Sequence, residues 1–228
     1  ATGSHRFVVR LMREMTVLAE ASETFYVYEE VPPSEETVHL LDPHREYLES
    51  VSKLARPGNL LAPVHVIPPL ANTIRAYPDN DLMQVLAQVK DGAIAIFFGP
   101  PDDWNELAAW LGNDVSATAK DAVGGFLPAC HYVKLHPVFD RLPSRCLMNQ
   151  PYANVAPNKT FLETGDEDIC GAFDASQAAV GNYMVENGAW WGSDILVRPY
   201  GSGRIVMTHL RLLEHLDEDP VARRIFVK

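Results

Sequence analysis

The stretch AIAIFFGPPDDWNELAAWLG, residues 93–112, shows the fold class most clearly. Ala93 to Phe98 is an unbroken apolar run, which is typical of a parallel strand covered on both faces. Gly99 and the prolines after it turn the chain, and Asp102 is placed to cap a helix. Gly112 is placed to end that helix. Its apolar stripe recurs at helical spacing and consists of Trp104, Leu107, Ala108 and Leu111.

The same alternation of strand and helix extends toward the N-terminus. Val64 to Ile67 indicates a strand, and Asp42 before Pro43 marks the start of an earlier helix. The two helices in this part have apolar faces, formed by Tyr47, Leu48, Val51 and Leu54 and by Leu82, Val85, Leu86 and Val89. Strands and helices that alternate over short connections predict right-handed βαβ units. We therefore expect a doubly wound, flavodoxin-like α/β fold, whose mainly parallel sheet has helices on both faces.

The flanks of this region carry further patterns. Helical spacing of four apolar residues predicts an opening helix, and Phe25 to Tyr28 indicates a short strand after it. The four residues are Phe7, Leu11, Met15 and Leu18. Turn residues and short β-like segments between about 126 and 191 predict a β-rich insertion. Ile195 to Pro199 and Arg204 to Thr208 form a predicted hairpin, and Asp219 caps a last helix.

Composition limits the class of protein. A chain of 228 residues is long enough for one substantial core, so we expect a single domain over residues 1–228. Thirty acidic residues against 19 Lys and Arg give a net charge of −11, with the basic residues scattered. This balance argues against nucleic acid and anionic membranes as partners. No apolar run is long enough to cross a bilayer, so we expect a soluble protein.

Cysteine usage and the chain ends add two expectations. Cys130, Cys146 and Cys170 show no Cys-x-x-Cys spacing, which predicts neither a disulfide framework nor a zinc site and favours a reducing, cytoplasmic compartment. The chain starts at Ala1 and stops at Lys228 within a predicted helix. We therefore expect it to be a fragment of a longer protein.

Several motifs in the C-terminal third carry a family resemblance. They are HPVFDRLP at 136–143, WGSDILVRPYG at 191–201, GRIV at 203–206, LLEHL at 212–216 and DPVA at 219–222. Together these motifs resemble class I glutamine amidotransferase-like domains, in particular those appended to bacterial glycoside hydrolases of the β-galactosidase and β-glucuronidase type. The resemblance implies a flavodoxin-like fold. It also implies an opening strand before the first helix, which we expect to be missing from this chain.

The resemblance implies a cysteine nucleophile in a Gly-x-Cys-x-Gly turn and a His-x-Glu pair after a late strand. Cys130 has neither glycine, and its neighbour His131 is adjacent only in sequence. We interpret Cys130 as a structural cysteine, with a nucleophile as the alternative. His209 lies where the catalytic histidine is expected, but Arg211 stands in place of the glutamate. Glu214 is a candidate substitute; otherwise His209 is an inert remnant.

Other candidate sites concern metals, cofactors and sugars. Three histidine pairs have spacings of five or six residues, which do not place both rings on one helix face, so we expect no metal site. These pairs are His39 with His44, His131 with His136, and His209 with His215. Because Gly99 to Asp102 lacks the glycine fingerprint of a nucleotide site, we also expect no cofactor. Trp190 and Trp191, with Tyr183, form a candidate carbohydrate-binding face. The alternative is that the two tryptophans pin the β-rich flank onto the sheet.

Two hypotheses of function follow from these patterns. The leading hypothesis is a non-catalytic accessory domain of a glycoside-hydrolase-type protein, which packs against another domain, self-associates or binds carbohydrate. The alternative is a hydrolase that uses Cys130 or His209 at the carboxyl edge of the sheet. The chain alone is expected not to be an enzyme.

Overall fold

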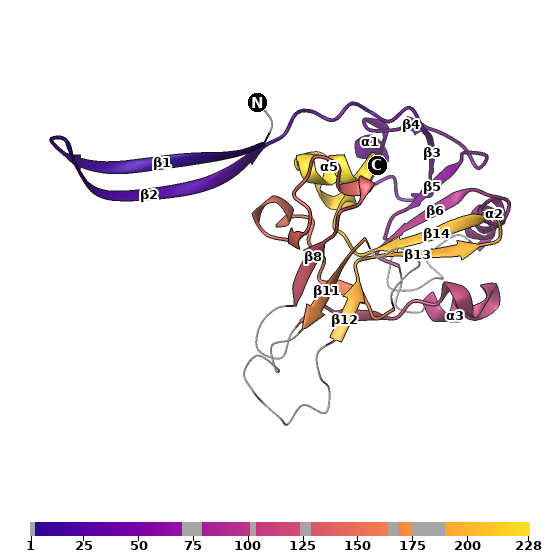
Figure 1. Ribbon diagram of the computed structural model, residues 1–228. Coiled ribbons are helices and arrows are strands. Elements are labelled where there is room, and N and C mark those ends of the chain that lie inside the picture. The colour runs from indigo at the N-terminus through magenta and orange to yellow at the C-terminus, as the bar shows by residue number, and fades with distance from the viewer. Residues whose placement is uncertain (1–2, 70–78, 101–103, 124–128, 164–168, 175–189) are drawn as a thin grey trace, which may run out of the picture. The chain divides into compact units, whose positions relative to one another are not determined.

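The computed structural model describes residues 3–69, 79–100, 104–123, 129–163, 169–174 and 190–228 (Figure 1). The chain forms two compact units, Ala1–Pro32 and Pro33–Lys228. Both large sheets lie in the second unit. The expectation of a single domain over the whole chain stays a prediction.

The first unit is a β-hairpin, so the predicted opening helix is wrong. Strands β1 (Gly3–Arg13) and β2 (Thr16–Val27) pair antiparallel over their whole length. The apolar residues at helical spacing stand among β-branched and aromatic residues, which fit a pleated strand equally well. Glu14 in the turn has a φ of 52°, the left-handed conformation that tight hairpin turns need. Cross-strand pairing therefore selected the two-residue repeat of a strand over the 3.6-residue repeat of a helix.

The second unit is built on a six-stranded, mostly parallel sheet. Its strands, in spatial order, are β13 (Ile195–Tyr200), β14 (Gly203–Thr208), β6 (Ile94–Phe98), β5 (Val64–Ile67), β3 (Thr37–Leu40) and β4 (Arg56–Pro57). All neighbours pair in parallel except β13, which forms an antiparallel hairpin with β14. The strands predicted around Val64, Ala93, Ile195 and Arg204 are confirmed.

The start of this unit differs from expectation in two ways. β3 is a four-residue strand that the sequence analysis did not predict, and it precedes helix α1 (Leu48–Ser52). The second unit therefore has a strand before its first helix. Asp42 does not cap the helix directly: its Oδ2 accepts a hydrogen bond from the backbone nitrogen of Tyr47, 2.8 Å away, and Tyr47 is the N-cap. The helix is consequently much shorter than predicted.

Two helices cover one face of this sheet. α2 (Asp79–Lys90) and α3 (Trp104–Leu111) were both predicted and are confirmed, while Asp102 lies outside the described residues. Their apolar stripes pack on alternate residues of the central strands. The core of this layer includes Ile67, Val85, Leu86, Val89, Phe97, Trp104, Ile205 and Met207. The Nε1 of Trp104 donates to the carbonyl oxygen of Val115, 2.7 Å away, which satisfies its buried polar atom.

The opposite face has less cover. The predicted last helix, α5 (Pro220–Phe226), packs there, and the rings of Phe226 and Phe98 lie 6.3 Å apart. Between this helix and the sheet remains a hollow of about 360 Å³. Its apolar walls include Val64, Val66, Ile94, Ile96, Val206 and Ile225.

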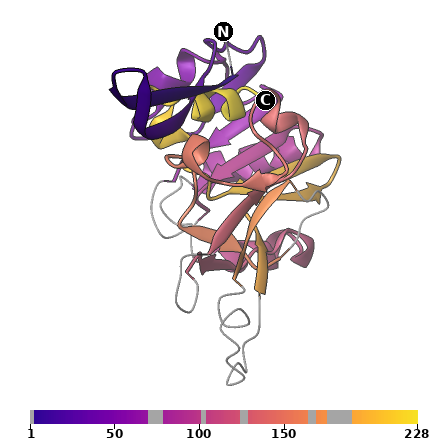
Figure 2. The same cartoon turned by 60° about the vertical axis from the view of Figure 1, so that its left-hand side comes forward.

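A second sheet of six strands is antiparallel throughout. In spatial order its strands are β7 (Ala119–Asp121), β10 (Lys159–Phe161), β12 (Trp190–Ser193), β11 (Cys170–Asp174), β8 (Cys130–Val133) and β9 (Cys146–Leu147). Figure 2 shows these strands beside the parallel sheet within the same unit. This sheet is the β-rich region predicted between about 126 and 191. Short 3₁₀ helices lie at Asn113–Val115, Pro137–Phe139, Gln150–Tyr152 and Leu213–His215.

Asp194 joins the two sheets. It lies between β12 of the second sheet and β13 of the parallel sheet. Its backbone nitrogen donates to the carbonyl oxygen of Cys170 at 3.0 Å, and its own carbonyl oxygen accepts from the hydroxyl of Thr208 at 2.9 Å. One residue thus bonds to a strand of each sheet.

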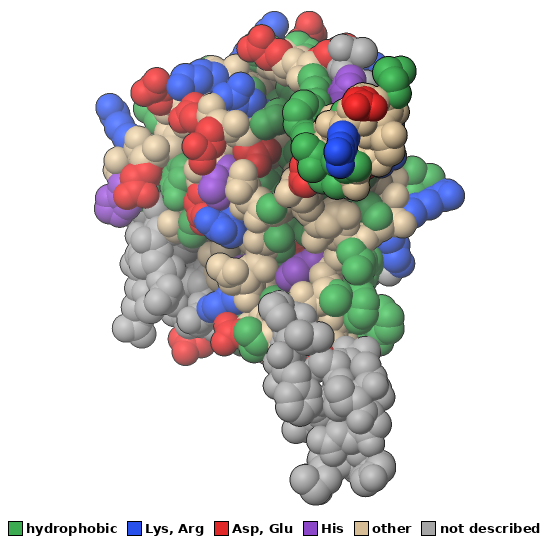
Figure 3. Space-filling view, turned by 90° about the vertical axis from the view of Figure 1, so that its left-hand side faces the viewer, with side chains coloured by type: hydrophobic (Ala, Val, Ile, Leu, Met, Phe, Trp, Pro, Cys, Tyr) green, Lys and Arg blue, Asp and Glu red, His purple; other side chains and the backbone are tan. Residues whose placement is uncertain are grey.

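The chain is therefore of mixed α/β type, with a mostly parallel sheet, few helices and a separate antiparallel sheet. None of the described helices is both long and apolar enough to cross a membrane. On the face drawn in Figure 3, basic side chains are interspersed with acidic ones and form no basic stripe.

Candidate functional site

The carboxyl ends of β6 and β14 border a hollow of about 240 Å³. Ligands of open α/β sheets bind at this edge. Its walls include Phe98, Gly99, Lys159, His209, Arg211 and Glu214. The structure thus brings together two of the predicted site residues, His209 and Glu214.

Three side chains of this hollow, those of His209, Arg211 and Glu214, make defined contacts. The ring of His209 stacks on Phe161, with centroids 4.5 Å apart. The Nε of Arg211 donates to Glu214 at 2.8 Å, which places the carboxylate of Glu214 in an ion pair with arginine. Arg211 also lies 3.2 Å from the Nε2 of His215. Arg211, which stands where the resemblance places a glutamate, therefore forms an ion pair with Glu214, the candidate substitute for that glutamate.

Cys130 and His131 lie elsewhere, on β8 of the second sheet. Adjacent residues of a strand point to opposite faces. Cys130 is exposed, whereas His131 points into the unit and contacts Asp194. The structure therefore does not place these two neighbours in one site.

His131 and Asp194 form a pair that the sequence analysis missed. The Nδ1 of His131 lies 2.7 Å from the Oδ2 of Asp194, whose side chain is fully buried. Burial raises the pKa of Asp194, and its hydrogen bonds to His131 and Thr160 oppose this rise. Because the pair lies at the junction of the two sheets, we interpret it as a link between them. Residues 63 positions apart give no pairing signal in a single sequence.

The two tryptophans also point to opposite faces of their strand, β12. Trp190 packs against a small buried cluster formed by Ala122, Ala129 and Ala172. The Nζ of Lys120 lies 4.9 Å from the centre of the Trp190 ring, within the range of a cation–π contact. Trp190 therefore takes part in packing, while Tyr183 lies outside the described residues.

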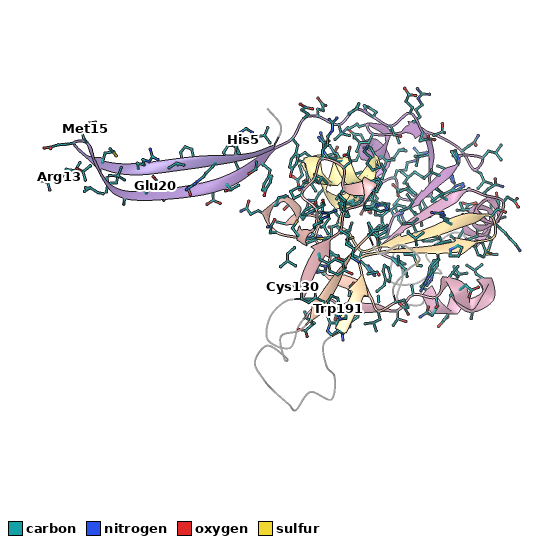
Figure 4. The ribbon with its side chains drawn as sticks, in the orientation of Figure 1. His5, Arg13, Met15, Glu20, Cys130 and Trp191 are labelled. Carbon is teal, nitrogen blue, oxygen red and sulfur yellow. The ribbon has the colours of Figure 1, made fainter. Side chains whose placement is uncertain are left out.

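Trp191 faces the other way and is 62% exposed. Its ring stacks on Phe173 of β11, with centroids 5.2 Å apart and an interplanar angle of 29°. Tyr132 of β8 lies 6.5 Å from both rings. These three residues form what we call the aromatic platform. Cys130 lies at its border, opposite Phe173 in the strand register, and Figure 4 labels Cys130 and Trp191 on the second sheet.

Two features shape the surface next to the platform. Gly171 lies beneath the phenol of Tyr132, since a Cβ at this position would lie 2.8 Å from its hydroxyl oxygen. The glycine therefore allows the ring to lie close to the sheet. On the other side of Tyr132 a shallow groove carries two cationic side chains, Lys134 and Arg145. The Nζ of Lys134 lies 5.9 Å from the centre of the Tyr132 ring.

Comparisons with known proteins give similarity to solved structures alone. No family model and no curated protein matches this sequence. Among solved structures the chain is similar to part of the exo-β-1,4-mannosidase Op5Man5 from Opitutaceae bacterium strain TAV5. The identity is 12% and the TM-score 0.42, over 85% of this chain and 35% of the mannosidase chain. This chain thus spans about a third of that glycoside hydrolase.

Metal-ligand geometry is absent from the described part of the chain: it contains no group of three or more His, Cys, Asp or Glu side chains placed to hold an ion. His39, considered above with His44, contacts His65 of the neighbouring strand, with their Nδ1 atoms 3.1 Å apart. Cys130, Cys146 and Cys170, all within the described residues, form no disulfide.

Proposed function

We propose that this chain is a non-catalytic accessory domain of a glycoside-hydrolase-type protein and that it binds carbohydrate on the aromatic platform. The observation that carries the proposal is the exposed indole of Trp191, stacked on Phe173 beside Tyr132. The glycoside-hydrolase context rests on the motif resemblance in the C-terminal third.

The platform has the chemistry that a sugar ring requires. A pyranose has an apolar face of C–H groups, which loses water favourably against an aromatic ring, and a rim of hydroxyl groups that need polar partners. Trp191 offers a ring face at the surface. The ammonium of Lys134 and the guanidinium of Arg145 lie in the adjoining groove as hydrogen-bond donors. The exposed, open shape fits a polysaccharide chain better than an enclosed monosaccharide.

The arrangement of the candidate catalytic residues supports a non-catalytic role. A nucleophile and its base must lie within hydrogen-bond reach of each other. Cys130 lies on the second sheet, whereas His209 lines the hollow at the edge of the parallel sheet. The carboxylate of Glu214 is bound to Arg211.

Affinity electrophoresis tests the proposal. The full chain is run through native gels that contain β-1,4-mannan, galactan, xylan or β-glucan, and we expect retardation by at least one of them. Trp191→Ala should weaken the affinity derived from that retardation by roughly two- to tenfold, because aromatic stacking contributes about 0.5–1.5 kcal/mol. Trp191→Phe should retain most of it.

A matched control removes an exposed apolar residue away from the platform. Leu61 is 78% exposed and lies in the segment before β5. Leu61→Ala should leave the mobility in every gel unchanged. Equal mobility of wild type and Trp191→Ala in all gels would remove the carbohydrate proposal.

The hydrolase alternative is favoured by one observation, the presence of His209 in the hollow at the carboxyl edge. It requires measurable hydrolysis of ester, amide or glycoside substrates by the chain. That activity must be lost in His209→Ala or Cys130→Ser while the fold persists. We expect no activity above that of these variants.

A further inference from the structure

The face of the second sheet that carries the aromatic platform continues onto its edge strand, β9. Leu147 of β9 pairs with Tyr132 of β8 in the strand register, so both side chains point to the same face of the sheet. Trp191 points to this face as well. Leu147 is 48% exposed and lines the shallow groove beside Tyr132. The groove therefore has an apolar side chain next to the platform.

Two cationic side chains lie at one end of the pair of strands β8 and β9. The register of these strands ends there with Val133 opposite Cys146. Lys134 follows β8 and Arg145 precedes β9, so the antiparallel pairing brings both cations to the same end. Both residues are exposed and line the groove. The groove therefore carries positive charge next to the platform.

The groove differs in charge from the chain as a whole. A net charge of −11 repels anionic ligands at long range. The described residues that line the groove, however, include no Asp or Glu. At physiological ionic strength, exposed charges that lie more than about 8 Å away are largely screened. The two cations therefore decide the local preference, and they favour an anionic group on the ligand.

The position of the cations indicates which kind of anion fits. The rings of Trp191 and Tyr132 have centroids 6.5 Å apart, and the Nζ of Lys134 lies 5.9 Å from the centre of the Tyr132 ring. In a uronic acid the carboxylate is bonded directly to a ring carbon, so its charge stays beside the sugar ring. A sulfate ester extends further, on a rotatable C–O bond. Cations this close to the platform fit the carboxylate better.

Both cations have suitable chemistry for a carboxylate. The guanidinium of Arg145 presents parallel N–H donors that match two carboxylate oxygens, and the ammonium of Lys134 supplies a compact positive charge. The apolar C–H groups of the same sugar can pack against Leu147, which removes apolar surface from water. One uronic acid unit in the groove thus finds partners for its charge and for its apolar face.

From these observations we propose that the platform and its groove recognise a polysaccharide that contains uronic acid. One sugar stacks on Trp191, and the carboxylate of a neighbouring sugar is bound by Lys134 and Arg145. This inference rests on the carbohydrate-binding function proposed above and names the class of sugar that the site prefers.

Calorimetric titration of the full chain with matched oligosaccharides tests the inference. Oligomers of β-1,4-linked mannuronic acid and of β-1,4-linked mannose differ only in whether the exocyclic carbon is a carboxylate or a hydroxymethyl group. We expect the acidic oligomer to bind about three- to tenfold more tightly, because two exposed ion pairs add this much affinity. The ratio should fall in about 0.5 M NaCl, where the Debye length is shorter. Oligogalacturonate and its carboxyl-reduced form provide a second matched pair.

Charge-neutralising variants locate the preference. In Lys134→Gln combined with Arg145→Gln, the affinity ratio of acidic to neutral oligomer should fall to about one, while the neutral oligomer binds within about twofold of its wild-type affinity. Arg145→Gln alone should lower the ratio in part, and Arg145→Lys should restore most of it. Arg56→Gln is the matched control for the single change. Arg56 is exposed and lies on β4, at the edge of the parallel sheet. Its loss should leave the ratio unchanged.

Trp191→Ala separates this inference from the function on which it rests. Binding of neutral oligomers that depends on Trp191, without any preference for the acid, would overturn the uronic-acid inference and leave the carbohydrate platform in place. Failure of both acidic oligomers to bind would overturn the inference, while the gels with neutral polysaccharides decide the carbohydrate function separately. An acid preference that survives in the double variant, or tighter binding of a sulfated mannose oligomer than of the mannuronate, would also overturn it.

Discussion

His39 and His65 show how one buried contact makes stability depend on pH. Their Nδ1 atoms share one hydrogen bond between adjacent strands, so one ring donates and the other accepts. His65 is fully buried, and burial together with the neighbouring His39 lowers its pKa to about 4. Burial also lowers the pKa of His39, which Asp81 partly opposes. The folded protein therefore favours neutral rings.

The first prediction concerns this pair. Unfolding lets His65 regain its usual pKa of 6.5, so the unfolded chain binds more protons than the folded chain between pH 6.5 and about 4. The contribution is fully present above pH 6.5, and up to about 3 kcal/mol is lost as the pH falls through this window. Urea unfolding across the window should show a shallower pH slope for His65→Leu than for wild type. Parallel slopes would contradict the assignment.

At the scale of an element, the hydrogen bonds of one side chain, Asp219, stabilise helix α5. Its N-cap Asp219 accepts through Oδ1 from the backbone nitrogens of Val221 at 2.7 Å and Ala222 at 3.3 Å. The other carboxylate oxygen accepts from the side-chain amide of Asn154 at 2.9 Å. One side chain thus starts the helix and fixes it to Asn154, which follows the 3₁₀ helix Gln150–Tyr152. The buried residues of α5 close part of the sheet's second face.

The second prediction separates these two roles of Asp219. Asp219→Ala should lower the free energy of unfolding by about 1–3 kcal/mol, because both the cap and the bond to Asn154 are lost. Asp219→Ser keeps a capping oxygen and should lose about half as much. Chemical denaturation of the three proteins gives the comparison. Equal losses for Ala and Ser would mean that capping contributes little here.

At the scale of the whole molecule, the chain consists of a hairpin unit and an α/β unit joined near Pro32. The segment after β2 has no regular secondary structure and includes two exposed residues, Glu29 and Glu30. Proteases cut exposed, irregular chain more readily than paired strands. The boundary between the units should therefore be the first part of the full chain to open.

The third prediction follows from this boundary. Brief digestion of the full chain with a glutamate-specific protease should cut first after Glu29 or Glu30 and leave a resistant fragment that starts at or near Val31. Glu20 and Glu23 lie within β2 and serve as internal controls. Mass spectrometry of the early products identifies the cut. A first cut within the α/β unit would contradict the division into two units.

The sequence alone determined the elements whose patterns are local. A continuous apolar run from Ile94 to Phe98, a regular stripe along α2, and a capping aspartate before Pro220 each act through neighbours a few residues away. The β13–β14 hairpin was also predictable from sequence, because glycines mark the tight turn between the two strands. These patterns predicted the α/β class and most of its parallel sheet.

Only the tertiary structure decided the features that depend on distant partners. The spacing of Phe7 to Leu18 fits a helix as well as a strand, and pairing with β2 selected the strand. Strands far apart in the chain decide three further features. They set the contact of Phe173 with Tyr132 and the burial of Asp194 against His131. They also decide what Trp190 and Trp191, which point in opposite directions, each pack against. A single sequence records which side chains exist, whereas register and packing decide which of them meet.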